Sequence, residues 1–170
     1  MTVQTERNTQ DEMADAADGH VQTGGQRQFI SLKVGSENYA IDILAVREIK
    51  GWTSTTVLPN QPDHVLGVLN LRGAIVPVFD LRCRFGQGLT EATRMHVVII
   101  VKVLERTVGI LVDAVSDILT VNTGEIRPVP EMERAASIEY FAGIVSVNDG
   151  TVVILNLEKL FNQTDLQAAA

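Results

Sequence analysis

The sequence contains little that would form a disulfide, bind a nucleic acid or cross a membrane. Cys83 is the single cysteine among 170 residues, so an intramolecular disulfide is excluded and a reducing compartment is expected. Aromatic residues make up 5% of the chain and the net charge is −7, which argues against the stacking surfaces and cationic patches that hold nucleic acids. The longest aliphatic run, residues 97–101, is far shorter than the roughly 20 residues of a membrane helix. A cytoplasmic protein without membrane insertion is expected.

Patterns that would indicate catalysis or metal binding are equally scarce. No C-x-x-C or H-x-x-x-H spacing offers a zinc site, and the glycine pairs lack the Lys-Ser/Thr of a phosphate-binding loop. An acid/base set of Asp80, Asp113 and Asp117 is conceivable, but capping and turn roles explain these carboxylates more simply. We therefore expect no enzyme, no cofactor and no metal.

The first 27 residues differ in composition from the rest of the chain. Residues 1–27 contain five acidic and two basic side chains, few branched aliphatics and no aromatic residue, so they can bury too little apolar surface to offset the entropy of ordering. A disordered acidic tail is expected over 1–27, a folded domain over 28–163 and a frayed C-terminus over 164–170.

The folded domain is predicted to be mainly β. Short runs rich in valine and isoleucine, separated by turn residues, predict four hairpins, over residues 29–43, 67–79, 96–112 and 140–155. Asp80 and Asn156 each precede apolar residues at helical spacing, which predicts two short capped helices. Pro77 cannot donate a ladder hydrogen bond, so its strand is expected at a sheet edge or a bulge.

The sequence also repeats itself. Residues 39–49 align with 108–118 at an offset of 69, and 67–85 align with 143–161 at an offset of 76, with several identical pairs. An internal duplication predicts two small barrels, roughly 28–90 and 91–163, packed together with a groove between them.

Two further features are candidates for binding. Ile43, Val46 and Ile49 recur every third residue, a spacing that predicts a turn of helix followed by extended chain. They either lie in the core or form an apolar strip, rimmed by Glu48, that accepts a partner helix. Arg72, at a hairpin tip, is either an exposed turn residue or a residue whose guanidinium binds a partner's carboxylate or carbonyl groups.

At these segments the chain resembles the CheW family of chemotaxis coupling proteins. The segments are Ile41-Asp42-Ile43-Leu44-Ala45-Val46-Arg47-Glu48-Ile49, the turn Gly67-Val68-Leu69-Asn70-Leu71-Arg72-Gly73 with residues 75–82, and residues 108–118. The resemblance implies an all-β fold of two SH3-like five-stranded barrels. It also implies a non-enzymatic adaptor that joins the cytoplasmic tips of chemoreceptors to the regulatory domain of the histidine kinase CheA.

The resemblance further implies where the partners bind. The receptor-binding groove would be formed by Ile30, Ile43, Val46, Glu48, Ile49, Val115 and Ile118. Arg72 would contact the kinase or the receptor. The alternatives are a barrel that binds a small ligand and a CheW-like scaffold for a kinase pathway other than chemotaxis.

Overall fold

The computed structural model describes residues 25–130, 138–148 and 150–161. These residues form ten strands, two four-residue helices and three short 3₁₀ turns. The expected acidic tail lies outside the described residues up to residue 24, and the first strand begins at Gln26, earlier than expected. The expected frayed C-terminus also lies outside them.

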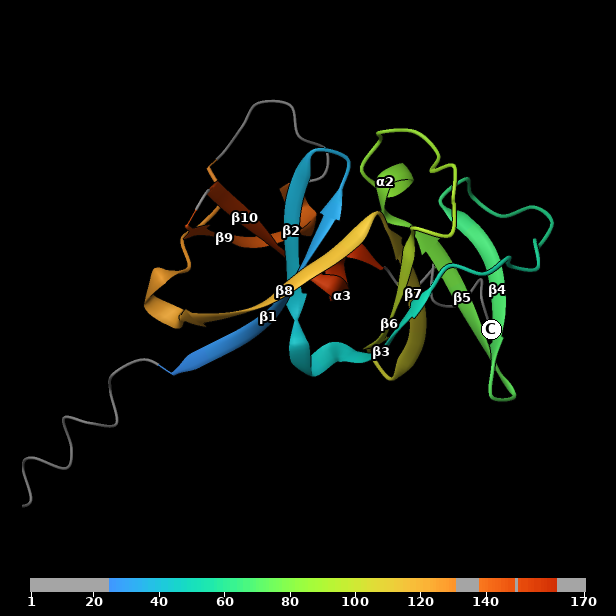
Figure 1. The fold of residues 1–170 in the computed structure, drawn as a ribbon, viewed down its shortest axis with the longest axis horizontal. Helices are drawn as coiled ribbons and strands as arrows, with labels where there is room; N and C mark the ends of the chain where they lie inside the picture. The colour runs from blue at the N-terminus through green and yellow to red at the C-terminus, as the bar shows by residue number, and fades with distance from the viewer. Residues whose placement is uncertain (1–24, 131–137, 149, 162–170) are drawn as a thin grey trace, which may run out of the picture.

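The strands form two five-stranded sheets, so the predicted mainly β class with two five-stranded units is confirmed (Figure 1). The first lobe has the order β8 (Ala114–Asn122), β1 (Gln26–Val34), β2 (Glu37–Asp42), β10 (Gly150–Leu155), β9 (Phe141–Val147). The second lobe has the order β3 (Val46–Gly51), β6 (Val97–Val103), β7 (Arg106–Val112), β5 (Ala74–Asp80), β4 (Val65–Leu71). One isolated bridge joins Arg127, in the segment after β8, to Ile144 of β9, and another joins Thr56, in the segment after β3, to Val68 of β4. In each sheet the chain that leaves one edge strand therefore pairs with the opposite edge strand, which closes the sheet into a small barrel.

The boundary expected near residue 90 does not separate the two lobes. After β2 the chain passes through the 3₁₀ turn η1 (Ile43–Ala45) into the second lobe, where β3 forms the edge strand. After β7 it returns to the first lobe as β8. Each half of the chain therefore contributes strands to both sheets, and neither half contains a whole barrel. A unit of four or five short strands is marginal alone, and here each lobe combines a hairpin from one half, β1–β2 or β6–β7, with three strands from the other half.

The strand registers reproduce the sequence repeat and support the internal duplication. The pairs Ile30–Ile41 and Ile99–Ile110 differ by 69 residues, and the pairs Gly67–Val78 and Gly143–Ile154 differ by 76. Both lobes also contain one parallel pair, β2 with β10 and β7 with β5. The two lobes are thus related by an approximate two-fold repeat of backbone structure.

The predicted hairpins and helices are present. The four hairpins are β1–β2, β4–β5, β6–β7 and β9–β10, and the helices are α2 (Leu81–Arg84) and α3 (Leu157–Leu160). Pro77 was expected at a sheet edge or a bulge, but β5 lies between β4 and β7, and the register shift of the β4–β5 pair lies between Val65 and Gly67, not at the Pro77–Val68 pair. Pairing with β7 begins at Val78, so at Pro77 the strand has a neighbour on one side only and its missing donor is tolerated.

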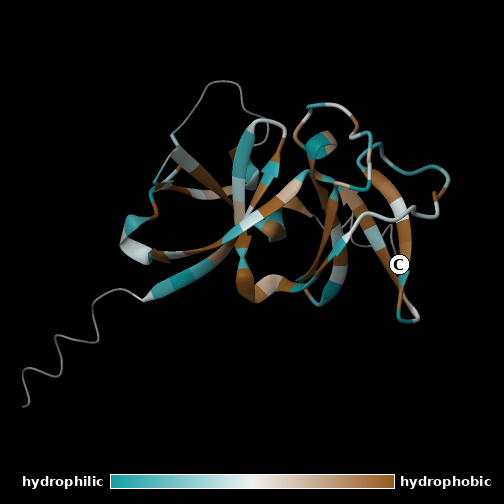
Figure 2. Cartoon of the chain, viewed as in Figure 1, coloured by the Kyte–Doolittle hydropathy of each residue, from teal (hydrophilic) through white to brown (hydrophobic). Residues whose placement is uncertain are grey.

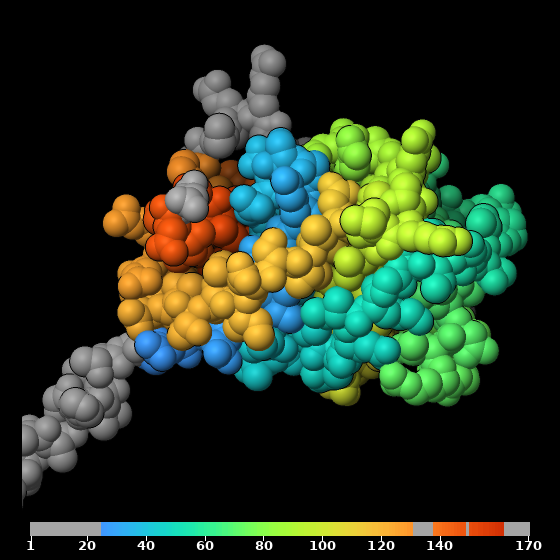
Figure 3. Space-filling model, in the orientation of Figure 1, coloured from blue at the N-terminus to red at the C-terminus, as the bar shows by residue number. Residues whose placement is uncertain are grey.

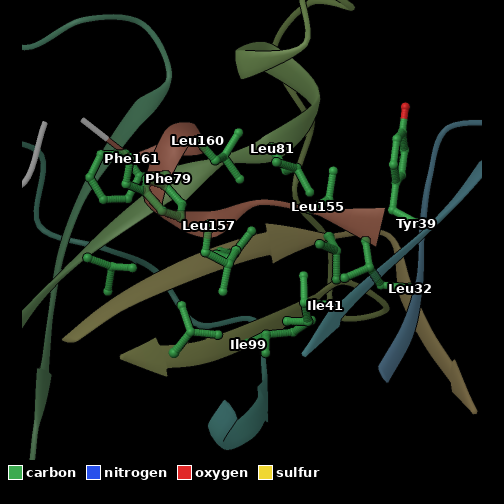
Figure 4. Packing of buried hydrophobic residues seen from close by; sticks show 14 of the residues in the cluster. Leu32, Tyr39, Ile41, Phe79, Leu81, Ile99, Leu155, Leu157, Leu160 and Phe161 are labelled. Carbon is green, nitrogen blue, oxygen red and sulfur yellow. The ribbon is translucent and has the colours of Figure 1, made fainter. Parts of the chain in front are cut away.

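The largest hydrophobic cluster lies between the lobes and draws on both sheets. Figure 4 shows Leu32 and Ile41 of the first lobe near Ile99 of the second, with side chains of α3 above them. The rings of Phe79 and Phe161 lie 4.8 Å apart, centroid to centroid. Smaller clusters fill each barrel separately. The lobes therefore share one continuous core, which from here on is called the inter-lobe core.

The two helices begin at equivalent caps of unequal strength. The carboxylate of Asp80 is fully buried and accepts hydrogen bonds from the backbone N–H of Arg82, Cys83 and Thr90 and from the Thr90 hydroxyl, at 2.7–3.4 Å. Asn156, its counterpart, accepts one bond from the backbone N–H of Lys159 at 3.2 Å. Asp80 thus also holds the loop that follows α2.

We predict that Asp80→Ala destabilises the protein far more than Asn156→Ala. Removing Asp80 leaves several donors without a partner and should lower the free energy of unfolding by about 2–4 kcal/mol, against about 1 kcal/mol for the single cap. Urea unfolding followed by circular dichroism measures both. Equal losses would show that the loop contacts of Asp80 contribute nothing.

Candidate functional site

The three-residue spacing of Val46 and Ile49 is explained by a bulge in β3. Val46 pairs with Val101 and Ile49 with Ile99, and a register shift between Val46 and Glu48 inserts one extra residue. A bulge of this kind keeps two residues that are three apart on the same face of a strand. Since Val101 and Ile99 both belong to the inter-lobe core, Val46 and Ile49 lie on that side of the sheet. The predicted turn of helix before the strand is η1.

The same arrangement recurs in β8. Val115 pairs with Leu32 and Ile118 with Ile30, with the register shift between them. Leu32 and Ile30 also belong to the inter-lobe core. The four residues Val46, Ile49, Val115 and Ile118, here called the β3–β8 strip, therefore continue the shared core outward along the two edge strands.

The strip is accessible at its outer ends. Ile49 is 44% exposed and Ile118 is 58% exposed, while Val46 and Val115 are half-buried against the core. Figure 3 shows β8 and β3 running beside each other across this face, with atoms of β1 visible in the shallow recess between them. Because the inter-lobe core fills the space beneath, the expected groove is a shallow surface recess at this face.

Two residues around the strip differ from expectation. Ile30 is only 5% exposed and belongs to the inter-lobe core, so it supports the recess from below and does not line it. Ile43 is half-buried against the same core, next to Leu44, which is 79% exposed. Figure 2 shows η1 as a hydrophobic segment at the surface. Leu44 was not identified from the sequence, because an apolar residue in a short apolar run gives no sign of which side faces solvent.

Glu48 and Arg72 meet on the other face of β3. Glu48 pairs with Ile100, which belongs to the separate cluster inside the second lobe, so its side chain does not face the strip. Arg72 Nη2 donates to Glu48 Oε2 at 2.8 Å. Arg72 and Gly73 form the two-residue turn of the β4–β5 hairpin with φ of +53° and +87°, and the Asn70 side chain accepts from the Gly73 N–H. The turn leaves the Arg72 side chain 77% exposed.

The carboxylates considered for acid/base chemistry do not converge. Asp80 is a buried helix cap, Asp113 contacts His96 Nε2 at 3.2 Å and accepts from the Gly35 N–H, and Asp117 is exposed on β8. Across the described residues no three His, Cys, Asp or Glu side chains are arranged to hold a metal ion. Burial raises the pKa of the Cys83 thiol, and the carboxylates of Asp80 and Asp63 raise it further, so no reactive thiolate is favoured.

Among the described helices, none has the length and apolar character needed to cross a membrane.

We predict that the strip tolerates a charge where the core beside it does not. Ile49→Asp should change the free energy of unfolding by about 1 kcal/mol or less, because the carboxylate can reach water at this position. Ile99→Asp, across the strand pair and fully buried, should abolish folding. Circular dichroism and urea unfolding of both variants test this; an unfolded Ile49→Asp would place Ile49 in the core.

Comparison with known proteins identifies the family. The CheW-like domain matches residues 28–165. The chain is 41% identical over 145 residues to the probable chemotaxis protein CheW of Rhizobium etli, covering 85% of this chain and 94% of that protein. It is 40% identical over 147 residues to the chemotaxis protein CheW of Rhizobium meliloti, covering 86% and 95%. The crystal structure of the scaffolding protein TtCheW from Thermoanaerobacter tengcongensis superimposes with a TM-score of 0.75 at 30% identity, over 85% of this chain and 93% of that one. The all-β double lobe and these matches together show that the chain belongs to the CheW-like family of chemotaxis scaffold proteins.

Proposed function

We propose that this protein is a cytoplasmic adaptor that couples the cytoplasmic tips of chemoreceptors to the histidine kinase CheA and so supports array assembly and kinase control. Membership of the CheW-like family supports this proposal. The observation that carries it is the β3–β8 strip, in which Ile49 and Ile118 are exposed at equivalent positions of the two lobes. Exposed apolar residues that continue a core are typical of a protein-binding surface.

The strip suits a helical partner. An amphipathic helix inserts apolar residues at intervals of three or four positions into a shallow apolar recess. Val46 and Val115 would form the base of such a contact, and Ile49 and Ile118 would flank it. A recess of this kind, with few polar anchors, fits a moderate affinity in the micromolar range, or about −8 kcal/mol.

Signal transfer in this proposal requires no chemistry at the adaptor. A change in receptor packing converts the receptor from one state to another. This change alters kinase activity if the adaptor surfaces that join receptor and kinase bind the two receptor states with different affinities. The protein acts as a scaffold without catalytic residues or a cofactor, and it reaches the membrane only through its receptors.

The Arg72–Glu48 pair would supply a second contact. The guanidinium at the hairpin tip is held by one carboxylate and is otherwise largely exposed, so it can donate further hydrogen bonds to a partner's carboxylate or carbonyl groups. Glu48 fixes the direction of the side chain, and the rigid two-residue turn fixes its position.

We predict that Ile49→Asp and Ile118→Asp abolish receptor binding by a folded protein. Each places a carboxylate in an apolar contact, where desolvation opposes binding. Co-sedimentation with receptor cytoplasmic fragments, after circular dichroism has verified the fold, measures the loss. Leu89→Asp is the matched control, since Leu89 is 59% exposed outside the strip. Undiminished binding by both strip variants would contradict the proposal.

We predict that Arg72→Ala leaves the fold intact and weakens the ternary assembly with receptor and kinase. The ion pair is exposed, so its loss should cost about 1 kcal/mol of stability or less, whereas a lost contact to a partner would reduce kinase stimulation in reconstituted arrays. The charge-reversed double variant Arg72→Glu with Glu48→Arg restores an internal pair without the guanidinium at the tip, and it should stay defective. Full activity of Arg72→Ala would remove this contact from the proposal.

A further inference from the structure

Asp113 lies where the chain crosses from the second lobe to the first. It follows β7 and immediately precedes β8, the strand that carries Val115 and Ile118. Its backbone N–H donates to the Lys33 carbonyl oxygen at 2.9 Å, next to the first pairs of the ladder between β8 and β1. Asp113 therefore stands at the start of one of the two edge strands that form the strip.

The carboxylate of Asp113 joins one group from each lobe. Its Oδ2 accepts from the backbone N–H of Gly35, in the turn of the β1–β2 hairpin of the first lobe, at 2.6 Å. Its Oδ1 lies 3.2 Å from Nε2 of His96, the residue immediately before β6 in the second lobe. The side chain thus connects the two sheets directly.

The surroundings of His96 decide which of its ring nitrogens donates. The backbone N–H of Thr93 donates to His96 Nδ1 at 3.0 Å, so Nδ1 acts as an acceptor. A neutral imidazole then carries its proton on Nε2, which contacts Asp113. Because His96 Nε2 and the Gly35 N–H are both donors, both oxygens of Asp113 must accept. The contacts among these three residues, Gly35, His96 and Asp113, are here called the Asp113 clasp.

His96 also holds the end of the other edge strand. Its carbonyl oxygen accepts from the backbone N–H of Trp52 at 3.0 Å, and Trp52 immediately follows β3. One residue therefore binds the start of β8 through its side chain and the end of β3 through its backbone. Since β3 and β8 run beside each other across the face that carries the strip (Figure 3), the clasp lies at the end of the recess nearest in the chain to Ile49 and Val115.

The other crossing between the lobes has different chemistry. The offset of 69 relates Asp113 to Leu44, in η1 between β2 and β3, and it relates the hairpin turn at Gly35 to the one at Leu104. Leucine side chains neither donate nor accept hydrogen bonds, and Leu44 and Leu104 are 79% and 50% exposed. Polar side-chain contacts thus hold the recess at one end, whereas the equivalent positions at the other end carry exposed apolar side chains.

We propose that Asp113 and His96 are positioning residues that set the separation of β3 and β8 at one end of the recess. The consequence for binding rests on the proposed function: a helix that occupies the strip contacts side chains of both strands, so the separation of the strands determines how well it fits. Neither residue needs to touch the partner. Loss of the clasp lowers affinity because Ile49 and Val115 are no longer held at a fixed spacing.

Asp113→Asn breaks the clasp at almost constant side-chain volume. The amide has a single accepting oxygen, so it can bond either the Gly35 N–H or His96 Nε2, but not both. The other donor then faces the amide NH₂ group. We expect this variant to stay folded and to co-sediment with receptor cytoplasmic fragments about three- to ten-fold more weakly, the effect of one lost hydrogen bond.

Strand separation is measured without any partner. Nitroxide labels at Gly51→Cys on β3 and Ser116→Cys on β8, both exposed positions, report it by electron paramagnetic resonance in a Cys83→Ser background. Asp113→Asn should broaden the distribution of label distances. An unchanged distribution would overturn the proposal.

His96 supplies the conservative comparison. His96→Gln keeps an amide N–H that can donate to Asp113, whereas His96→Leu has no donor. The label distances and the receptor affinity should therefore be close to those of the parent protein in His96→Gln, and altered in His96→Leu as they are in Asp113→Asn. Equal behaviour of the two His96 variants would overturn the positioning role of this residue.

Asn156→Ala is the matched control for stability. It removes the single hydrogen bond that caps α3, outside the strip, and should change neither the label distances nor the receptor affinity. If it broadened the label distances as much as Asp113→Asn, the effect would come from general destabilisation, and the proposal would be overturned.

Failure of this inference is distinguishable from failure of the proposed function. Undiminished binding by Ile49→Asp and Ile118→Asp would contradict the proposed function, and with it the consequence of the clasp for affinity. Loss of binding by those two variants, together with full binding by Asp113→Asn, would support the proposed function and overturn the positioning role.

Discussion

The apolar core between the two lobes is the interaction on which the other features depend. Each lobe is a sheet of five short strands with a small cluster of its own, too little buried surface for a stable fold alone. The inter-lobe core joins both sheets and both ends of the repeat, with α3 packed into it. Because β3 and β8 form edges of this core, a single set of apolar contacts both stabilises the fold and sets the position of the binding strip.

This coupling has a functional consequence for the proposed adaptor. Ile49 and Ile118 are held on rigid strands by partners that are almost fully buried, Ile99 and Ile30. A surface that is preorganised in this way loses little conformational entropy when a partner binds. The exposed Arg72–Glu48 pair lies on the opposite face of β3, so one strand presents two chemically different surfaces, and an adaptor needs at least two.

Local sequence patterns predicted the hairpins, the capped helices and the duplication, because turns, caps and alternating strands depend on neighbouring residues. The division into halves at residue 90 was wrong for a physical reason: an edge strand forms the same ladder whether its partner comes from its own repeat or from the other one. The bulge was also missed, although its trace is visible as the same V-x-x-I spacing at Val46–Ile49 and Val115–Ile118. Ile30 was placed in the groove by the family resemblance, and matching positions along a sequence do not distinguish a core residue from one that lines a recess.

The amino-acid sequence by itself determined the class of fold, the twofold repeat and the three-residue apolar spacing at Val46 and Ile49, which follow from residue type and from spacing along the chain. Its resemblance to known proteins indicated the family and added Val115 and Ile118 to the candidate strip. Tertiary structure alone decided that the hairpins β1–β2 and β6–β7 pair with strands from the other half of the chain, that Ile49 and Ile118 reach solvent while Ile30 does not, and that Arg72 meets Glu48. These outcomes depend on contacts between segments far apart in the chain, and such contacts form only when the two lobes pack on their common core.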